Sequence, residues 1–242
     1  MTRLADQVAV VTGAGSGIGK AIALALGTQG ATLALVGRRL GPLESVVALA
    51  QAAGVAARAC PADLAHEEQI HDLTAALQRE YSRVDILVHS AAMIRMGTVA
   101  DAPAEDLDLH YQANLRGPYL LTQDLLPLIR LRQGQIVFIN SSAGLTARAN
   151  VGQYAATKHA LKAIADSLRD EVNRDGVRVL SVFPGRTATP TQERLHALER
   201  RPYRPDRLLQ PEDVADVVVN ALCLPRTAEV TEIKIRPMLK WD

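Results

Sequence analysis

The chain has 242 residues, of which 48% are hydrophobic and 22% are charged, so it is long enough to bury a full core. Its 27 lysines and arginines balance 26 aspartates and glutamates, which argues against an overall field that attracts nucleic acid or anionic lipid. The two cysteines, Cys60 and Cys223, lie far apart and give no disulfide framework.

Short runs rich in β-branched residues alternate with longer helical patterns along the whole chain. The expected elements, in chain order, are strand 7–12 and helix 17–28, strand 31–36 and a helix ending at Gly54, strand 56–60 and helix 66–80, strand 84–90 and helical residues 103–131, strand 134–141 and helix 152–174, strand 176–183, an irregular stretch and a helix from Pro211, and strand 229–235.

These strands are apolar without strict alternation, as expected when a parallel sheet is buried on both faces. Repeated strand–helix units predict a Rossmann-like, doubly wound α/β fold. We expect a mostly parallel seven-stranded sheet with helices on both faces, in three α/β/α layers. The uncharged run 21–37 could imitate a membrane span, but Gly27 and Gly30 divide it into a helix and a strand. We interpret residues 1–242 as one domain.

Ligands of such sheets bind beyond the carboxyl ends of the strands. After the first strand comes "TGAGSGIG", residues 12–19, which opens a helix. Its glycines allow a tight turn and bring the backbone close to a pyrophosphate at the helix N-terminus. A plain strand–helix turn is the alternative, but glycine occupies four of the seven positions from 13 to 19. We therefore predict a dinucleotide site.

The second strand ends in "VGRRL", where Arg38 and Arg39 follow Gly37. An acidic residue about 20 positions beyond the glycines would bind a ribose 2′-hydroxyl and favour NAD. No acid stands there, and Arg38 can instead pair with a 2′-phosphate through charge-assisted hydrogen bonds. A solvated basic turn is the alternative. We expect NADP(H) to be preferred over NAD(H).

Tyr154 and Lys158 are one helical turn apart in "QYAATKHA", and Ser141 precedes Tyr154 by 13 residues. A carbonyl that accepts hydride becomes an alkoxide, which needs a proton and hydrogen-bond donors. A free tyrosine has a pKa near ~10, and a neighbouring positive charge lowers it. A chance pairing of two helical residues is the alternative for Tyr154 and Lys158 alone.

These motifs together resemble those of the short-chain dehydrogenase/reductase family, in its classical type, over nearly the whole chain. "TGAGSGIG" is similar to the family's TGxxxGxG motif, and Ser141, Tyr154 and Lys158 to its catalytic residues. The resemblance implies that Tyr154 is the general acid/base, that Lys158 lowers its pKa and that Ser141 orients the carbonyl. The implied cofactor residues are Gly13, Ser16, Gly17, Ile18, Gly19, Asp63, Leu64, Ala91, Tyr154, Lys158, Pro184 and Gly185, with Thr187 and Thr189 as further candidates.

Three positions leave alternatives open. Asn114 in "YQANLRG" resembles the family's helix asparagine that extends a proton relay, and it could instead satisfy local backbone groups. Asp63 could cap the following helix rather than contact adenine. "HSAA", residues 89–92, departs from the family's Asn-Asn-Ala-Gly, which puts the geometry of the nicotinamide-ribose site in question.

Residues 186–210 are expected to form a mobile substrate lid. Its part from residue 190 to residue 210 carries five arginines, Arg194, Arg200, Arg201, Arg204 and Arg207. An anionic substrate is one hypothesis for them, and a solvated loop is the other. The pocket walls are expected from residues 93–96, 142–145 and the lid.

The sequence therefore predicts an NADP-preferring oxidoreductase that interconverts a small ketone or aldehyde and an alcohol. A redox-sensing NADP(H)-binding module, or a reductase of C=N or C=C bonds, is the alternative. No metal site is expected, because the six histidines do not cluster. The N-terminal residues lack a signal-peptide pattern, so we expect a cytoplasmic location without a membrane partner. The resemblance also implies a homodimer or homotetramer.

Overall fold

The computed structural model describes residues 2–239. Its strands are β1 (Val8–Thr12), β2 (Thr32–Gly37), β3 (Ala57–Pro61), β4 (Ile86–His89), β5 (Gln135–Ile139), β6 (Arg178–Pro184) and β7 (Glu232–Ile235). Its α-helices are α1 (Gly17–Thr28), α2 (Leu40–Ala52), α3 (Glu67–Tyr81), α4 (Ala104–Tyr111), α5 (Gly117–Leu131), α6 (Gly152–Val172), α7 (Pro190–Leu198) and α8 (Pro211–Leu222).

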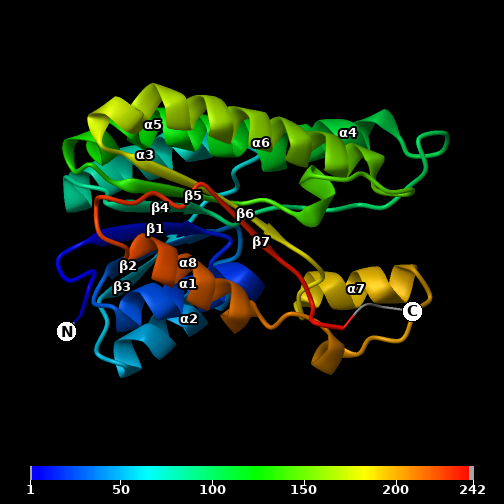
Figure 1. Cartoon of the computed structure of the whole chain (residues 1–242), viewed down its shortest axis with the longest axis horizontal. Helices are drawn as coiled ribbons and strands as arrows, with labels where there is room; N and C mark the ends of the chain where they lie inside the picture. Colours follow the sequence, from blue (N-terminus) through cyan, green and yellow to red (C-terminus); the bar gives the residue numbers. More distant parts are fainter. Residues whose placement is uncertain (1, 240–242) are drawn as a thin grey trace.

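The seven strands form one sheet in the order β3-β2-β1-β4-β5-β6-β7. Every neighbouring pair runs parallel, so the expected sheet is confirmed and contains no antiparallel strand among the described residues. In Figure 1, α3, α4, α5 and α6 cover one face, and α1, α2 and α8 cover the other. This is the predicted three-layer α/β/α arrangement.

Both faces of the sheet are buried under apolar side chains. On one face, Ile22 of α1 and Val218 of α8 join a core that includes Val11. On the other, Leu125 of α5 and Leu161 of α6 pack with Val10. Successive side chains of a strand thus pack into the cores on opposite faces of the sheet, which explains why the strands are apolar without alternation.

The order in which strands are added to the sheet reverses between β1 and β4. From β1 it builds outward through β2 to β3, and it then returns to place β4 on the other side of β1. The connections that follow β1 and β4 therefore lead to helices on opposite faces of the sheet, and a crevice forms at the carboxyl ends of the strands. The predicted site residues lie on the loops and helices around this crevice.

The stretch after β6 is not irregular as expected, because it contains α7. Thr189 caps this helix, its side chain accepting a hydrogen bond from the Gln192 amide at 3.2 Å, and Pro190 occupies the first helical turn. These two start signals were overlooked in a segment dominated by arginine and proline. A five-residue π-helical stretch, Gln112–Arg116, also interrupts the predicted helix 103–131.

Asp85 ties the start of β1 to the segment before β4. The residue is 6% exposed, and its carboxylate accepts hydrogen bonds from the Val8 amide at 2.9 Å, from Arg83 at 2.7 and 2.8 Å, and from Arg132 at 3.3 Å. Burial acts to raise the pKa of Asp85, but the hydrogen bonds from Arg83 and the Val8 amide outweigh it and hold the pKa below the usual value.

Asp85→Asn should therefore lower the free energy of unfolding by about 1–3 kcal/mol at pH 7. A carboxylate with a depressed folded-state pKa stabilises the protein above its unfolded pKa of about 3.9, and this contribution disappears as pH falls through the folded value. Urea unfolding at pH 7 and at pH 3 to 4 measures the difference. A gap between the two proteins that stays constant across this range would contradict the proposed role of the Asp85 charge.

No helix within residues 2–239 is both long and apolar enough to cross a membrane.

Candidate active site

A cleft of about 1030 Å³ opens at the carboxyl ends of the strands. All the predicted site residues except Asn114 line it. These residues are Gly13, Ser16, Gly17, Ile18, Gly19, Arg38, Arg39, Asp63, Leu64, Ala91, Ser141, Tyr154, Lys158, Pro184, Gly185, Thr187 and Thr189. Residues far apart in the sequence thus meet in one cavity, of a size that suits a dinucleotide together with a small substrate.

The turn between β1 and α1 is so tight that it has no room for a side chain at Gly13 or Gly19. A Cβ on Gly19 would lie 2.5 Å from the carbonyl oxygen of Gly13. Gly13 and Gly17 both have positive φ angles, of 66° and 53°, which L side chains rarely adopt. The backbone at the N-terminus of α1 is therefore bare and lines the cleft. Such a cradle fits the diphosphate of a dinucleotide.

Thr12 holds this turn against the loop that follows β4. Its buried hydroxyl donates to the Val88 carbonyl at 3.3 Å and accepts from the amides of Ser90 and Ala91, both at 3.0 Å. A Cβ on Gly13 would lie 2.8 Å from the Ala91 nitrogen, so the two loops are in direct contact. Thr12 therefore sets the separation of the two loops at the switch point, a role that was not predicted.

Arg38 and Arg39 line the cleft directly after β2, at the position predicted for a 2′-phosphate. Asp63 lies beyond the neighbouring strand β3, and its Oδ1 accepts a hydrogen bond from the Ala65 amide at 3.1 Å. Asp63 does not cap α3, because the N-cap residue of that helix is His66. The helix-capping alternative for Asp63 is thus wrong, and its carboxylate orders the loop beside the cleft.

Ser141 and Tyr154 meet at the end of the cleft nearest β5 and β6. Ser141 follows β5, two residues after Ile139, and its hydroxyl accepts a hydrogen bond from the Ala143 amide at 3.1 Å. Both side chains line the cleft there. Burial raises the pKa of the Tyr154 phenol, and its interaction with Ser141 acts in the opposite direction. Tyr154 is accordingly a protonated phenol at neutral pH.

Lys158 is buried, with 1% of its surface exposed, although its ammonium lines the cleft. Its Nζ donates to the Ile139 carbonyl at 3.1 Å and lies 5.8 Å from the centroid of the Tyr154 ring. Burial lowers the pKa of Lys158 to about 8. The expected net lowering of the Tyr154 pKa by Lys158 is not found, because burial dominates the titration of both side chains.

Asn114 lies behind the cleft rather than in its wall. Its Oδ1 accepts from the Met93 amide at 2.8 Å, and its Nδ2 donates to the Met93 carbonyl at 2.9 Å and to Thr157 Oγ1 at 3.3 Å. Thr157 in turn donates to the Tyr154 carbonyl at 2.8 Å. Asn114 therefore joins the loop after β4 to the helix that carries Tyr154, which favours the alternative of local backbone satisfaction.

A family model for the short chain dehydrogenases matches residues 7–200. An uncharacterised oxidoreductase of Staphylococcus epidermidis is 36% identical over 239 residues, covering 98% of this chain and 100% of that protein. The chain belongs to the short-chain dehydrogenase/reductase family.

Solved structures of similar proteins agree with this assignment. An alcohol dehydrogenase from the archaeon Thermococcus sibiricus, complexed with 5-hydroxy-NADP, has a TM-score of 0.88 and 26% identity, with 98% of each chain covered. A metagenomic short-chain oxidoreductase in complex with NADP has a TM-score of 0.86 and 31% identity, covering 98% of this chain and 100% of that one. The protein is thus an NAD(P)-binding oxidoreductase of the short-chain family.

The family departure at residues 89–92 falls partly outside the cleft of this dehydrogenase. His89 lies in the core, where its Nε2 is 2.8 Å from Thr122 Oγ1 and its ring stacks on Phe138. Burial, with a smaller effect of the Lys158 charge, lowers the pKa of His89 to about 3, so the ring is neutral. Ser90, Ala91 and Ala92 do line the cleft. The unusual histidine is therefore a packing residue.

The expected walls of the substrate pocket are only partly correct. Met93, Ile94 and Arg95 line the cleft together with Gln192, Arg194 and Leu195 of α7. Residues 142–145 do not line it, because they form a short 3-10 turn that packs against α6. Within residues 2–239, no group of His, Cys, Asp or Glu side chains is arranged to hold a metal ion.

Two residues that position the site were not predicted. Asn140 precedes Ser141; its Oδ1 accepts the Ser141 amide at 2.9 Å and its Nδ2 donates to the Lys158 carbonyl at 3.0 Å, which joins β5 to α6. His110 of α4 is fully buried with its ring edge-on to Tyr154, the centroids 6.2 Å apart. The sequence itself shows an asparagine between the apolar strand and Ser141, so Asn140 could have been predicted. His110 could not, because only the fold brings it to Tyr154.

Proposed function

We propose that this dehydrogenase is an NADP-preferring oxidoreductase that interconverts a ketone or aldehyde and an alcohol. The observation that carries the proposal is that Ser141, Tyr154 and Lys158 together line a dinucleotide-sized cleft, with the Lys158 ammonium 5.8 Å from the centroid of the Tyr154 ring. The Thermococcus sibiricus structure, an alcohol dehydrogenase with a bound NADP derivative, supports the same reaction class.

When bound, a nicotinamide cofactor supplies the hydride that reduces the carbonyl carbon. Tyr154, a phenol with a raised pKa, donates its proton to the oxygen of the forming alkoxide. Ser141 hydrogen-bonds the same oxygen and fixes its position opposite the hydride. The Lys158 ammonium, 5.8 Å from the Tyr154 ring centroid, stabilises the phenolate left after proton transfer. In alcohol oxidation the proton moves in the reverse direction.

The preference for NADP(H) rests on the two arginines after β2. Arg38 and Arg39 line the cleft where a doubly wound fold places the adenosine ribose. The acidic residue that would favour NAD is missing from this position, where the sequence reads "VGRRL". The bound NADP of the metagenomic short-chain oxidoreductase supports this assignment.

Arg38→Gln should raise the KM for NADPH about 10- to 100-fold, because it removes a charge-assisted hydrogen bond to the 2′-phosphate. The KM for NADH, which lacks that phosphate, provides the internal control and should change less than about threefold. Steady-state kinetics with both cofactors measures the ratio. Equal losses for NADPH and NADH would show that Arg38 supports the fold of the loop rather than the phosphate.

A screen of NADPH oxidation over ketones, aldehydes, imines and enones tests the proposed reaction. We expect turnover with at least one ketone or aldehyde and the corresponding alcohol as product. Tight NADPH binding without oxidation across the panel would favour a redox sensor, and turnover of imines or enones alone would favour the C=N or C=C reductase. Homo-oligomer formation and cytoplasmic location stay predictions.

A further inference from the structure

Two arginines line the part of the cleft that lies beside Tyr154 and away from the adenosine end. Arg95 stands on the loop after β4, and Arg194 stands on α7. In Figure 1, α4 and the loop that precedes it lie at the upper right of the molecule, and α7 lies below them at the lower right. Among the described residues that line the cleft, Asp63 is the only acid, and it lies after β3 at the adenosine end.

Arg95 is held in place beside the candidate catalytic tyrosine. Its backbone amide donates to His110 Nε2 at 3.0 Å, and His110 packs edge-on against the ring of Tyr154. One guanidinium nitrogen of Arg95 donates to Asp106 at 2.5 Å. The side chain of Arg95 is nevertheless 54% exposed, so N–H donors beyond the one bound to Asp106 remain accessible from the cleft.

Arg194 is the single lid arginine that reaches the cleft. Of the five arginines in residues 190–210, the other four do not line it in the part of the chain that the structure describes. The side chain of Arg194 makes no ion pair or hydrogen bond with any other residue in the range 2–239. Its helix is fixed at both ends, by the Thr189 cap and by an ion pair of 2.7 Å between Arg186 and Glu199.

We propose that the substrate carries a carboxylate, which Arg194 binds from α7 and Arg95 binds from the loop after β4. This inference rests on the proposed carbonyl reduction and names the class of carbonyl compound, an oxo acid. Asp106 offsets the charge of Arg95, so the two arginines and this aspartate leave one net positive charge, which matches a monoanion; the Lys158 ammonium is directed instead at the Ile139 carbonyl and the Tyr154 ring. A phosphate group carries about −1.5 to −2 charges at pH 7, and this one net positive charge would neutralise it less completely.

The test uses a series of aliphatic and aromatic oxo acids and the methyl ester of each. The ester keeps the carbonyl and the carbon skeleton but removes the charge. We expect the wild-type protein to show a kcat/KM at least about tenfold higher for an acid than for its ester. Arg194→Gln should reduce this acid-over-ester ratio about 10- to 100-fold, and Arg95→Gln should reduce it in the same direction.

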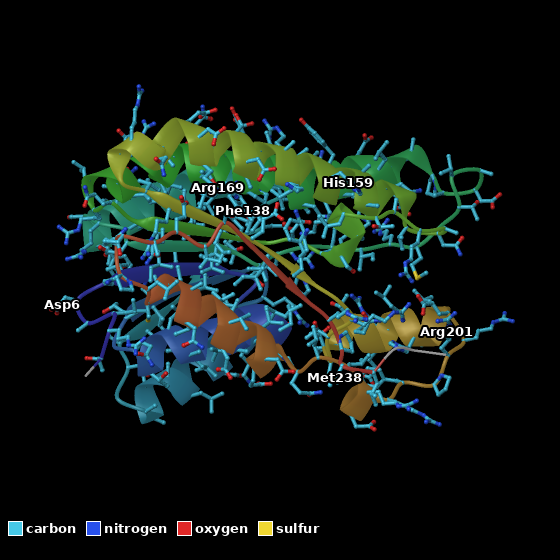
Figure 2. The ribbon with its side chains drawn as sticks, in the orientation of Figure 1. Asp6, Phe138, His159, Arg169, Arg201 and Met238 are labelled. Carbon is cyan, nitrogen blue, oxygen red and sulfur yellow. The ribbon has the colours of Figure 1, made fainter. Side chains whose placement is uncertain are left out.

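Arg201→Gln is the matched control, because Arg201 is an exposed arginine just beyond the C-terminal end of α7 (Figure 2) and does not line the cleft. This variant should keep the wild-type ratio. The KM for NADPH, measured in every variant, separates a substrate effect from a cofactor effect. Equal losses for acid and ester in Arg194→Gln, with a raised KM for NADPH, would overturn the proposal and assign Arg194 to the cofactor.

The screen distinguishes failure of the carboxylate proposal from failure of the proposed carbonyl reduction. If the protein reduced neutral ketones or the esters but no oxo acid better than its ester, the carboxylate proposal would be wrong and the carbonyl reductase would stand. If no ketone or aldehyde of any charge were reduced, the proposed function itself would be wrong.

Discussion

Tyr154→Phe is expected to lower kcat about 10²- to 10⁴-fold while the protein still binds NADPH. The substitution removes the phenol that donates the proton to the alkoxide, and it leaves the ring that packs against His110 and faces Lys158. Steady-state kinetics with a carbonyl substrate found in the screen gives kcat. Fluorescence titration with NADPH gives the affinity of the variant.

Tyr119→Phe is the matched control for this change. Tyr119 is a half-exposed tyrosine on α5, outside the cleft, so losing its hydroxyl should leave kcat and NADPH affinity within about twofold of wild type. If Tyr154→Phe retained nearly normal activity, the proton would come from another group and the proposed mechanism would be wrong. If Tyr154→Phe lost NADPH binding as well, its effect would be on the cofactor.

Lys158→Met is expected to lower kcat/KM about 10²- to 10³-fold at pH 7. Methionine retains most of the length and the apolar packing of the lysine stem but removes the charge near the Tyr154 ring. The pH profile gives a second measurement. Because burial lowers the pKa of Lys158 to about 8, its positive charge is present below that pH and is lost as pH rises through it.

The wild-type kcat/KM for the cofactor, which reports groups of the free enzyme, should therefore fall above about pH 8. The Lys158→Met variant should lack this alkaline decline. Lys162→Met, one turn further along α6, removes a lysine that pairs with Asp166 and Glu232 at the surface, and it should retain the wild-type profile. An unchanged alkaline decline in Lys158→Met would show that another group titrates.

The sequence predicted the sheet well because each strand signal is local. An apolar β-branched run between turn residues predicts a strand wherever the chain places it, and the glycines after β1 show where the backbone must bend. The order of the strands follows from the doubly wound pattern. The helix α7 was missed, since its start at Thr189 and Pro190 lies among residues typical of a loop.

Some residues of the candidate site could be predicted from the sequence, and others could not. Ser141, Tyr154 and Lys158 were found from spacing and a family resemblance, and the structure places them together. Arg95 was expected only as part of the pocket wall 93–96, and His110 could not be found, because the position of each beside Tyr154 depends on how the loop after β4 packs against α4. The pKa of Tyr154 was predicted to fall from the lysine's proximity in sequence alone, whereas burial, a property of the folded chain, raises it.

The central claim is that the chain reduces a carbonyl group by hydride from NADPH with a proton from Tyr154. Incubation with NADPH deuterated at the transferable position of the nicotinamide, followed by mass spectrometry of the product, measures the hydride step directly. We expect one deuterium on the carbinol carbon of an alcohol formed in equal amount to oxidised cofactor, and no such product at a comparable rate from Tyr154→Phe. Oxidation of the cofactor with the label absent from the carbinol carbon, or equal labelling rates in the two proteins, would contradict the claim.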